Sequence, residues 1–210
     1  PDDDSGGRDG RDFDRKDRED GGGLADDEEE ARPVINASVV PPPKVDESSG
    51  ALNYQYPISV PPGRNGLQPN ISINYSNQRA NEENLFGYGW DIDIPYIERV
   101  NKKGIDKLYT AGYFSSSFDG ELASTTASGE TKYLAKIENG NFYKYEFTNG
   151  HWVVTDREGT VYKFGVTENG RKNDPEDQER VFRWMLQEIR DKNNNYIKYE
   201  YYKDSGQIYP

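Results

Sequence analysis

The sequence predicts an all-β protein built from antiparallel hairpins. Short runs of the chain alternate apolar and polar residues, which is the period of a half-buried strand. Turn residues, among them Asn-Gly and Asp-x-x-Gly, recur every 8 to 12 residues in the C-terminal half. Aromatic residues make up 13% of the chain and include 16 tyrosines, a composition that suits strands. These observations favour a meander of hairpin strips.

Charge divides the chain into two parts. Residues 1–32 hold 14 acidic and six basic residues, a net charge of −8 out of −12 for the whole chain. Their large apolar residues are Phe13 and Leu24, too few to offset the entropy of ordering, so we expect disorder. Residues 33–46, with Pro33 and three prolines at 41–43, predict an extended linker. We therefore expect a leader and linker at 1–46 and one β domain at 47–210, itself part of a longer chain.

The first strands are predicted around a Pro- and Gly-rich connection. Ile58 and Val60 alternate with polar residues before Pro61, Pro62 and Gly63, and residues 71–75 alternate again. The pattern predicts two paired strands with one buried face. Glycines then flank an aromatic residue in the run Gly87, Tyr88, Gly89, Trp90. We expect a positive φ at Gly87 or Gly89 and a buried Trp90.

The second half predicts a string of hairpins. Asn149-Gly150 is a strong signal for a type I′ turn, which needs positive φ at both central residues. Residues 180–189 have helical propensity as well, but alternation of Phe182, Trp184 and Leu186 favours a long strand with a shift in phase. The last strand places Ile197, Tyr199 and Tyr201 on one face, and we expect it to be a sheet edge. The predicted strands are 132–137, 142–147, 152–155, 160–164, 181–190 and 196–202.

The order of these motifs and their residues resemble a known family, the SpvB-type N-terminal domain of Tc toxin B components and RHS-repeat toxin proteins. The opening signature is carried by residues 56–63, 66–76, 87–90 and 97–99, and later signatures by 152–165 and 184–202. The resemblance covers roughly residues 50–210. The positions that carry it as structural motifs are Pro61, Pro62, Gly63, Gly66, Pro69, Tyr75, Gly87, Tyr88, Gly89, Trp90, Trp152, Gly159 and Trp184.

The resemblance implies a non-catalytic shell segment that helps to encapsulate and deliver a C-terminal toxic effector. It implies no cofactor, and its partners would be downstream RHS or β-shell segments and other toxin-complex subunits. It also implies secretion or a place at the bacterial surface. Transferase activity in some relatives belongs to a separate domain. A second function class stays open: a secreted carbohydrate- or cell-surface-binding module. Tyrosines such as Tyr143 and Tyr199 would serve it, although cross-strand packing is the simpler interpretation.

Motifs for catalysis are weak. His151 is the single histidine and follows the Asn149-Gly150 turn, where it has no predicted nucleophile or orienting partner. Residues 115–117 are serines in a predicted loop without the glycines of a nucleophile elbow. The carboxylates of Asp91 and Asp93, and those of Asp119 and Glu121, share strand faces and could suggest glycosidase chemistry. A solvated strand face explains them better, so we expect no enzyme.

Composition excludes several other classes. The chain has no cysteine, which rules out disulfides and thiolate metal sites. No run approaches the roughly 20 apolar residues of a membrane span. A sequence pI of about 4.7 argues against a nucleic-acid partner. The leader aspartates Asp9, Asp12, Asp14, Asp17 and Asp20 miss the alternate spacing of a calcium loop, so we expect no metal site.

Overall fold

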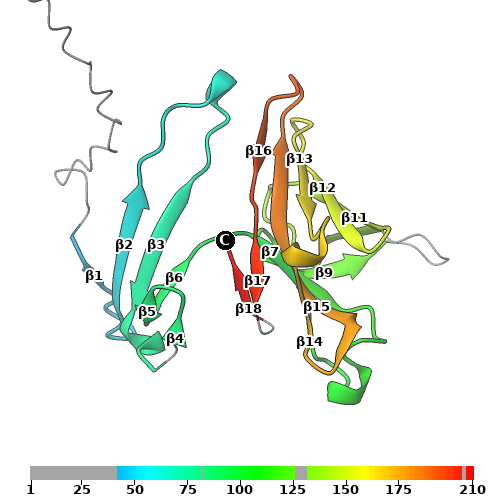
Figure 1. Cartoon of the computed structure of the whole chain (residues 1–210), viewed down its shortest axis with the longest axis horizontal. Coiled ribbons are helices and arrows are strands. Elements are labelled where there is room, and N and C mark those ends of the chain that lie inside the picture. The colour runs from blue at the N-terminus through cyan, green and yellow to red at the C-terminus, as the bar shows by residue number, and fades with distance from the viewer. Residues whose placement is uncertain (1–41, 82, 126–131, 205–206) are drawn as a thin grey trace, which may run out of the picture. The chain divides into compact units, whose positions relative to one another are not determined.

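The computed structural model describes residues 42–81, 83–125, 132–204 and 207–210 (Figure 1). Regular structure in these ranges consists of strands and short 3-10 helices, so the predicted all-β class is confirmed. None of the helices there is long and apolar enough to cross a membrane. The predicted leader and most of the linker, residues 1–41, lie outside the described ranges, and the first strand begins at Lys44.

A four-stranded antiparallel sheet forms the first part of the described chain. Its order is β1-β2-β3-β6, with β2 and β3 in register from Asn53↔Ser76 to Ile58↔Ile71. The connection between them contains the 3-10 helix η2, Arg64–Gly66, where Asn65 and Gly66 have φ of 55° and 78°. The bounds are β1 Lys44–Val45, β2 Leu52–Ile58, β3 Ile71–Ser76, η3 Asn77–Arg79, β4 Glu83–Asn84, β5 Gly87–Tyr88 and β6 Trp90–Ile92.

Strands β7 to β13 and β15 form a closed barrel. Strands β7 to β13 follow one another as an antiparallel meander, and β15 pairs with both β13 and β7, which joins the two ends of the sheet. Closure leaves these eight strands without a free edge in the barrel wall. The bounds are β7 Tyr96–Arg99, η4 Ile105–Lys107, β8 Phe114–Ser116, β9 Gly120–Ser124, β10 Lys132–Ala135, β11 Lys144–Thr148, β12 His151–Thr155 and β13 Val161–Phe164.

Strand β15, Asp177–Arg190, organises the barrel because it pairs with four other strands. Along one edge it pairs with β13 and then β14, and along the other with β16 and then β7. The pairing of β15 with β13 and with β14 contains register shifts, which correspond to the shift in phase of the apolar alternation predicted for this strand. The predicted strand at 181–190 is confirmed and is longer than expected. The remaining bounds are η5 Glu168–Gly170, β14 Arg171–Asp174, β16 Tyr196–Lys198, β17 Tyr202–Asp204 and β18 Gln207–Tyr209.

The core of the barrel is aromatic. Trp152 lies 4.9 Å from Phe114, 5.0 Å from Phe147 and 6.2 Å from Trp184 between ring centroids. Such tilted and edge-to-face pairs are favourable beyond the area they bury. The Trp184 Nε1 donates to the Gly150 carbonyl at 2.9 Å, which ties β15 to the turn between β11 and β12. The fully buried side chains are Ile97, Tyr145, Trp152, Val154, Phe164, Trp184 and Leu186.

Four local predictions are wrong. The strand expected from 142 begins at Lys144, because Phe142 has a φ of 56°, outside the strand region. Ser115 and Ser116 belong to β8 rather than to a loop. The strand expected at 196–202 breaks into β16 and β17, and Tyr201 between them turns inward, where its hydroxyl donates to the Leu186 carbonyl at 2.5 Å. The expected burial of Trp90 is only partial, because the indole lies on a sheet rather than in the barrel core.

Candidate functional site

In the first sheet, the backbone at the motif glycine Gly89 lies close to Tyr75 and Ser76 of β3. Gly87 and Gly89 have φ of 99° and 75°. A Cβ at Gly89 would lie 2.9 Å from the Tyr75 ring and 3.0 Å from the Ser76 carbonyl, so the position requires glycine. Tyr75 in turn packs against Trp90 with ring centroids 5.2 Å apart. Tyr88 is 61% exposed.

The motif positions around the first connection are also tight. A Cβ at Gly63 would lie 1.7 Å from the Leu67 carbonyl oxygen, so the chain turns back on itself after Pro61 and Pro62. Gly66 has positive φ, and Pro69 follows in the coil before β3. In the barrel, Trp152 and Trp184 lie in the core, and Gly159 has a φ of 86° in a hairpin turn. We propose that all these positions serve the fold.

The candidate catalytic groups are not brought together. His151 pairs with Thr148 across β11 and β12, and within the described ranges its ring makes no hydrogen bond. Asp119 accepts from the Tyr145 hydroxyl at 2.7 Å and from the Asn139 and Asn141 side chains. Glu121 is held by Lys102 and Lys136. Each carboxylate therefore has structural partners, and no three acidic or histidine side chains gather into a metal site in the described ranges.

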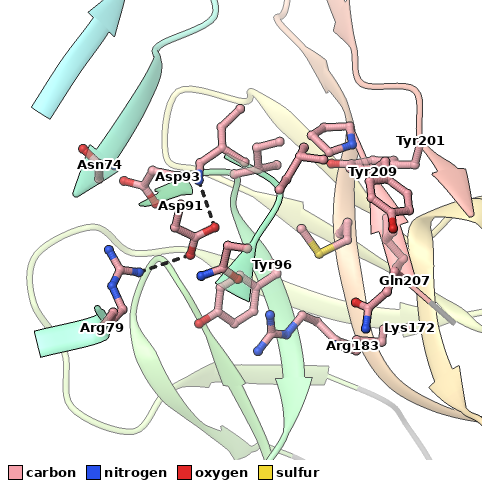
Figure 2. Close-up of a pocket in the computed structure, with 17 residues that line it drawn as sticks. Asn74, Arg79, Asp91, Asp93, Tyr96, Lys172, Arg183, Tyr201, Gln207 and Tyr209 are labelled. Atoms are coloured by element: carbon pink, nitrogen blue, oxygen red, sulfur yellow. Dashed lines mark hydrogen bonds and ion pairs between the residues drawn. The ribbon is translucent and has the colours of Figure 1, made fainter. Parts of the chain in front are cut away.

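A polar cleft of about 890 Å³ lies beside β6 and β18. Figure 2 shows one side lined by Asn74, Arg79, Asp91 and Asp93, and the other by Lys172, Arg183, Gln207 and Tyr209. Tyr96 lies between the two groups. The volume of the cleft is within the roughly 300–1,000 Å³ of clefts that bind small molecules.

The arginines of the cleft are locally neutralised. Arg79 Nη1 lies 3.2 Å from Asp91 Oδ2, and Asp91 Oδ1 accepts from the Ile92 amide at 2.9 Å. Arg183 donates through Nε and Nη2 to Glu98 Oε2 at 2.9 and 2.7 Å. The Arg183 guanidinium also lies 4.1 Å from the centroid of the Tyr96 ring. Both guanidinium groups are thus held in place with unused N–H groups.

Tyrosines form the less polar part of the cleft. The Tyr201 hydroxyl is committed to the Leu186 carbonyl, and burial raises the pKa of this hydroxyl. Tyr209 pairs with Tyr202 across β17 and β18, with ring centroids 6.4 Å apart. Sequence reasoning singled out Asp91, Asp93 and Tyr201 but missed the arginines, Lys172 and Gln207. No sequence signal marks these residues, because they come from four different elements of the chain, η3, β14, β15 and β18.

A second feature is the free edge of β16. Asp191 N donates to Asn195 O, and Tyr199 N donates to Gln187 O. By the alternation of antiparallel ladders, the backbone groups of Tyr196, Lys198 and Glu200 therefore point away from β15. In the part of the chain that the structure describes, β16 pairs with β15 alone. By contrast, the free edge of β6 is capped at Ile92 by the Asp91 carboxylate and the Ile94 amide.

The β12–β13 and β15–β16 hairpins, on opposite edges of β15, have loops of the same geometry. In the loop from Asp156 to Thr160, the Asp156 carboxylate accepts from the amides of Glu158 and Thr160 at 2.9 and 2.8 Å. In the loop from Asp191 to Asn195, Asp191 accepts from Asn193 and Asn195 at the same two distances. In each loop the fourth of the five residues has a positive φ, Gly159 in the first loop and Asn194 in the second. Hydrogen bonds from Asn195 lower the pKa of the Asp191 carboxyl.

The closed barrel, the aromatic core and the unpaired edge of β16 define an all-β barrel domain. The family described as Salmonella virulence plasmid 65kDa B protein, SpvB, matches residues 46–209. The chain therefore belongs to the SpvB family, as the sequence motifs indicated. Among curated relatives, mono(ADP-ribosyl)transferase SpvB of Salmonella choleraesuis strain SC-B67 is 23% identical over 205 residues, as is that of Salmonella enteritidis. The match covers 80% of this chain and 34% of each relative.

Solved structures share the fold. The crystal structure of TcdB2-TccC3 superposes with a TM-score of 0.64 at 20% identity, over 78% of this chain and 9% of that one. The N-terminal domain of effector protein SpvB from Salmonella typhimurium strain LT2 gives a TM-score of 0.58 at 23% identity, over 70% and 53% of the two chains. The chain is thus similar to a toxin-complex domain, and it spans about a third of the length of its curated relatives.

Proposed function

We propose that this chain is a non-catalytic structural segment of a secreted bacterial toxin shell, which helps to enclose and deliver an effector. The open edge of β16 beside a closed barrel carries the proposal. Unpaired backbone groups at Tyr196, Lys198 and Glu200 offer a template for a further strand. The partners would be downstream β-shell segments, and at the level of the assembly other toxin-complex subunits.

The likeness to TcdB2-TccC3 supports a place in such an assembly. The curated relatives carry a transferase name, but this chain matches only a third of their length. Among the candidate catalytic side chains, Asp91, Asp119 and Glu121 are engaged in structural contacts, and His151 lies in β12 without a neighbouring nucleophile among the contacts described above. We infer that transferase activity, where relatives have it, belongs to the remaining part of those proteins.

Blocking the open edge tests the proposal. Lys198→Pro removes an outward-pointing N–H without breaking the ladder to β15, because proline is tolerated where the N–H faces away from the partner strand. Sedimentation velocity over a range of concentrations should show self-association of the parent chain and a monomeric variant. Ile197→Pro is the matched control, since its N–H points toward β15 and its loss should lower stability.

A monomeric parent chain, or equal association in the Lys198→Pro variant, would contradict the docking role of this edge. Incubation with NAD and a mixed set of acceptor proteins checks the non-catalytic part of the proposal. We expect no ADP-ribosyl transfer and no release of nicotinamide above the rate without protein.

A further inference from the structure

We propose that the polar cleft binds a neutral, hydroxyl-rich ligand, and specifically an oligosaccharide. This function goes beyond a shell role and does not depend on the edge of β16. Two cationic side chains of the cleft are held in place, Arg79 by Asp91 and Arg183 by Glu98 (Figure 2). Four of its features narrow the class of ligand.

The first feature is charge. The lining carries three cationic side chains, Arg79, Lys172 and Arg183, and two carboxylates, Asp91 and Asp93. Glu98, which pairs with Arg183, balances the remaining positive charge. A polyanion needs an excess of cations to replace its counterions, whereas the three cations here are matched in number by three carboxylates. The ligand that fits carries little net charge.

The second feature is the supply of donors and acceptors. In the described part of the chain the Asp93 carboxylate, the Lys172 ammonium and the side-chain amide of Gln207 have no side-chain partner. Gln207 takes part in the β17–β18 ladder only through its backbone. Asn84 adds another amide. Carboxylate, ammonium and amide groups together can both accept from and donate to hydroxyls. Vicinal hydroxyl groups of a sugar present this mixed pattern.

The third feature is orientation. Arg79 is fixed by Asp91, and Arg183 is fixed between Glu98 and the Tyr96 ring. Side chains that are already immobilised lose little conformational entropy when a ligand binds. The remaining guanidinium N–H groups are therefore available as preoriented donors.

The fourth feature is apolar surface among the polar groups of the cleft. Ile94, Met185, Ile208 and the rings of Tyr201 and Tyr209 also line the cleft. Sugar rings carry C–H faces between their hydroxyls, and aromatic side chains bury such faces while their polar ends stay hydrated. A cleft that combines polar side chains with tyrosine rings and aliphatic side chains thus matches an amphipathic sugar rather than an apolar ligand.

An array of immobilised oligosaccharides tests the proposal on the full 210-residue chain. The array carries neutral hexose and N-acetylhexosamine oligosaccharides, sialylated and sulfated oligosaccharides, and one acidic and one basic peptide. We expect binding to neutral oligosaccharides, with an apparent Kd that changes less than about twofold between low and high salt, because a neutral ligand makes no screened ion pairs.

Two variants locate the site. Asp93→Asn and Gln207→Ala change exposed side chains of the cleft, and each should weaken binding about tenfold to a hundredfold, as expected when a hydrogen bond to a buried ligand is lost. Asp106→Asn is the matched control, because this exposed aspartate lies in η4, outside the cleft lining. Urea unfolding midpoints should be the same for all three variants.

Several outcomes would overturn the proposal. Signals no higher than the blank for every neutral oligosaccharide would do so. Preference for sulfated or sialylated oligosaccharides with steep salt dependence would instead indicate an anion site. Preference for either peptide would make the cleft a protein-docking groove. Neutral binding that survives both Asp93→Asn and Gln207→Ala would place the sugar site elsewhere on the chain.

Discussion

At the scale of single residues, glycines explain much of the family motif, and they do so in two ways. Gly159 needs its positive φ of 86°, but a Cβ there would meet nothing within 4 Å. Gly165 also has positive φ, 63°, and a Cβ there would lie 2.3 Å from Trp184 Cδ1. The first glycine serves backbone conformation alone, whereas the second also leaves room for the buried indole.

These two glycines give a matched pair of predictions. Gly159→Ala should cost about 1–2 kcal/mol in the free energy of unfolding, the usual penalty of a left-handed L-residue. Gly165→Ala should cost about 1–3 kcal/mol more, because Trp184 must also move in a close-packed core. Urea unfolding of both variants measures the difference. Equal losses would show that the core adjusts to the added methyl group without strain.

The two core tryptophans differ in one hydrogen bond. Trp184 Nε1 donates to Gly150 O, whereas Trp152 Nε1 is buried without a partner in the described structure. Replacing Trp184 by Phe leaves a carbonyl unpaired, while the same change at Trp152 removes an unpaired donor. We expect Trp184→Phe to be more destabilising than Trp152→Phe by about 1–2 kcal/mol. Thermal unfolding with two-state analysis measures the stability of both variants. A larger loss of stability in Trp152→Phe than in Trp184→Phe would contradict the stabilising role of the hydrogen bond to Gly150.

At the scale of elements, the two Asp-centred hairpin loops should contribute in the same way. Each aspartate accepts from two backbone amides that would otherwise face water or lack a partner. Asp156→Ala should therefore lower stability by about 1 kcal/mol, and Asp191→Ala should change it in the same direction. Asp106→Ala, an exposed helix position, serves as the control. A loss confined to one loop would show that the shared geometry does not imply shared energetics.

The order of strands is also an element-scale result. Register shifts let β15 pair with β13 and β14 along one edge and with β16 and β7 along the other. A strand with four partners ends the meander by closing it, and the next hairpin then leaves β16 outside the barrel. The open edge follows from this arrangement.

At the scale of the whole molecule, buried tyrosines predict how stability depends on pH. Burial raises the pKa values of the Tyr145, Tyr162 and Tyr201 hydroxyls above that of an unfolded chain. The folded protein keeps these protons when the unfolded chain loses them near pH 10. Stability should therefore be constant below about pH 9.5 and fall above pH 10, by up to about 1.4 kcal/mol per pH unit for each group.

Urea midpoints measured between pH 8 and pH 11.5 test this expectation. Tyr145→Phe removes one of the three groups and should make the alkaline decline shallower. Tyr88→Phe, at a ring that is 61% exposed, is the control. A parent chain whose midpoint is unchanged up to pH 11.5 would contradict the coupling between tyrosine burial and folding.

The sequence by itself determined the β class, the family and most of the hairpins. Alternation and turn residues are local signals, and the turn at Asn149-Gly150 forms with positive φ at both positions as expected. The long strand of residues 181–190 was also predicted, because its apolar alternation outweighs helical propensity. Local signals did not reveal the positive φ of Phe142 or the inward turn of Tyr201, and the latter depends on a tertiary hydrogen bond to the Leu186 carbonyl.

Only the tertiary structure decided that the meander closes into a barrel, whereas the edge position of the last predicted strand, now β16, was expected from the sequence. Closure depends on β15 pairing with β7, whose paired residues lie more than 80 positions apart in the chain, for example Arg183 and Glu98. The cleft has the same origin, because Arg79, Lys172, Arg183 and Gln207 come from four separate elements. Periodicity in a sequence reports which face of a strand is buried. It carries no information about which distant strands become neighbours, and the candidate sites of this protein lie between such neighbours.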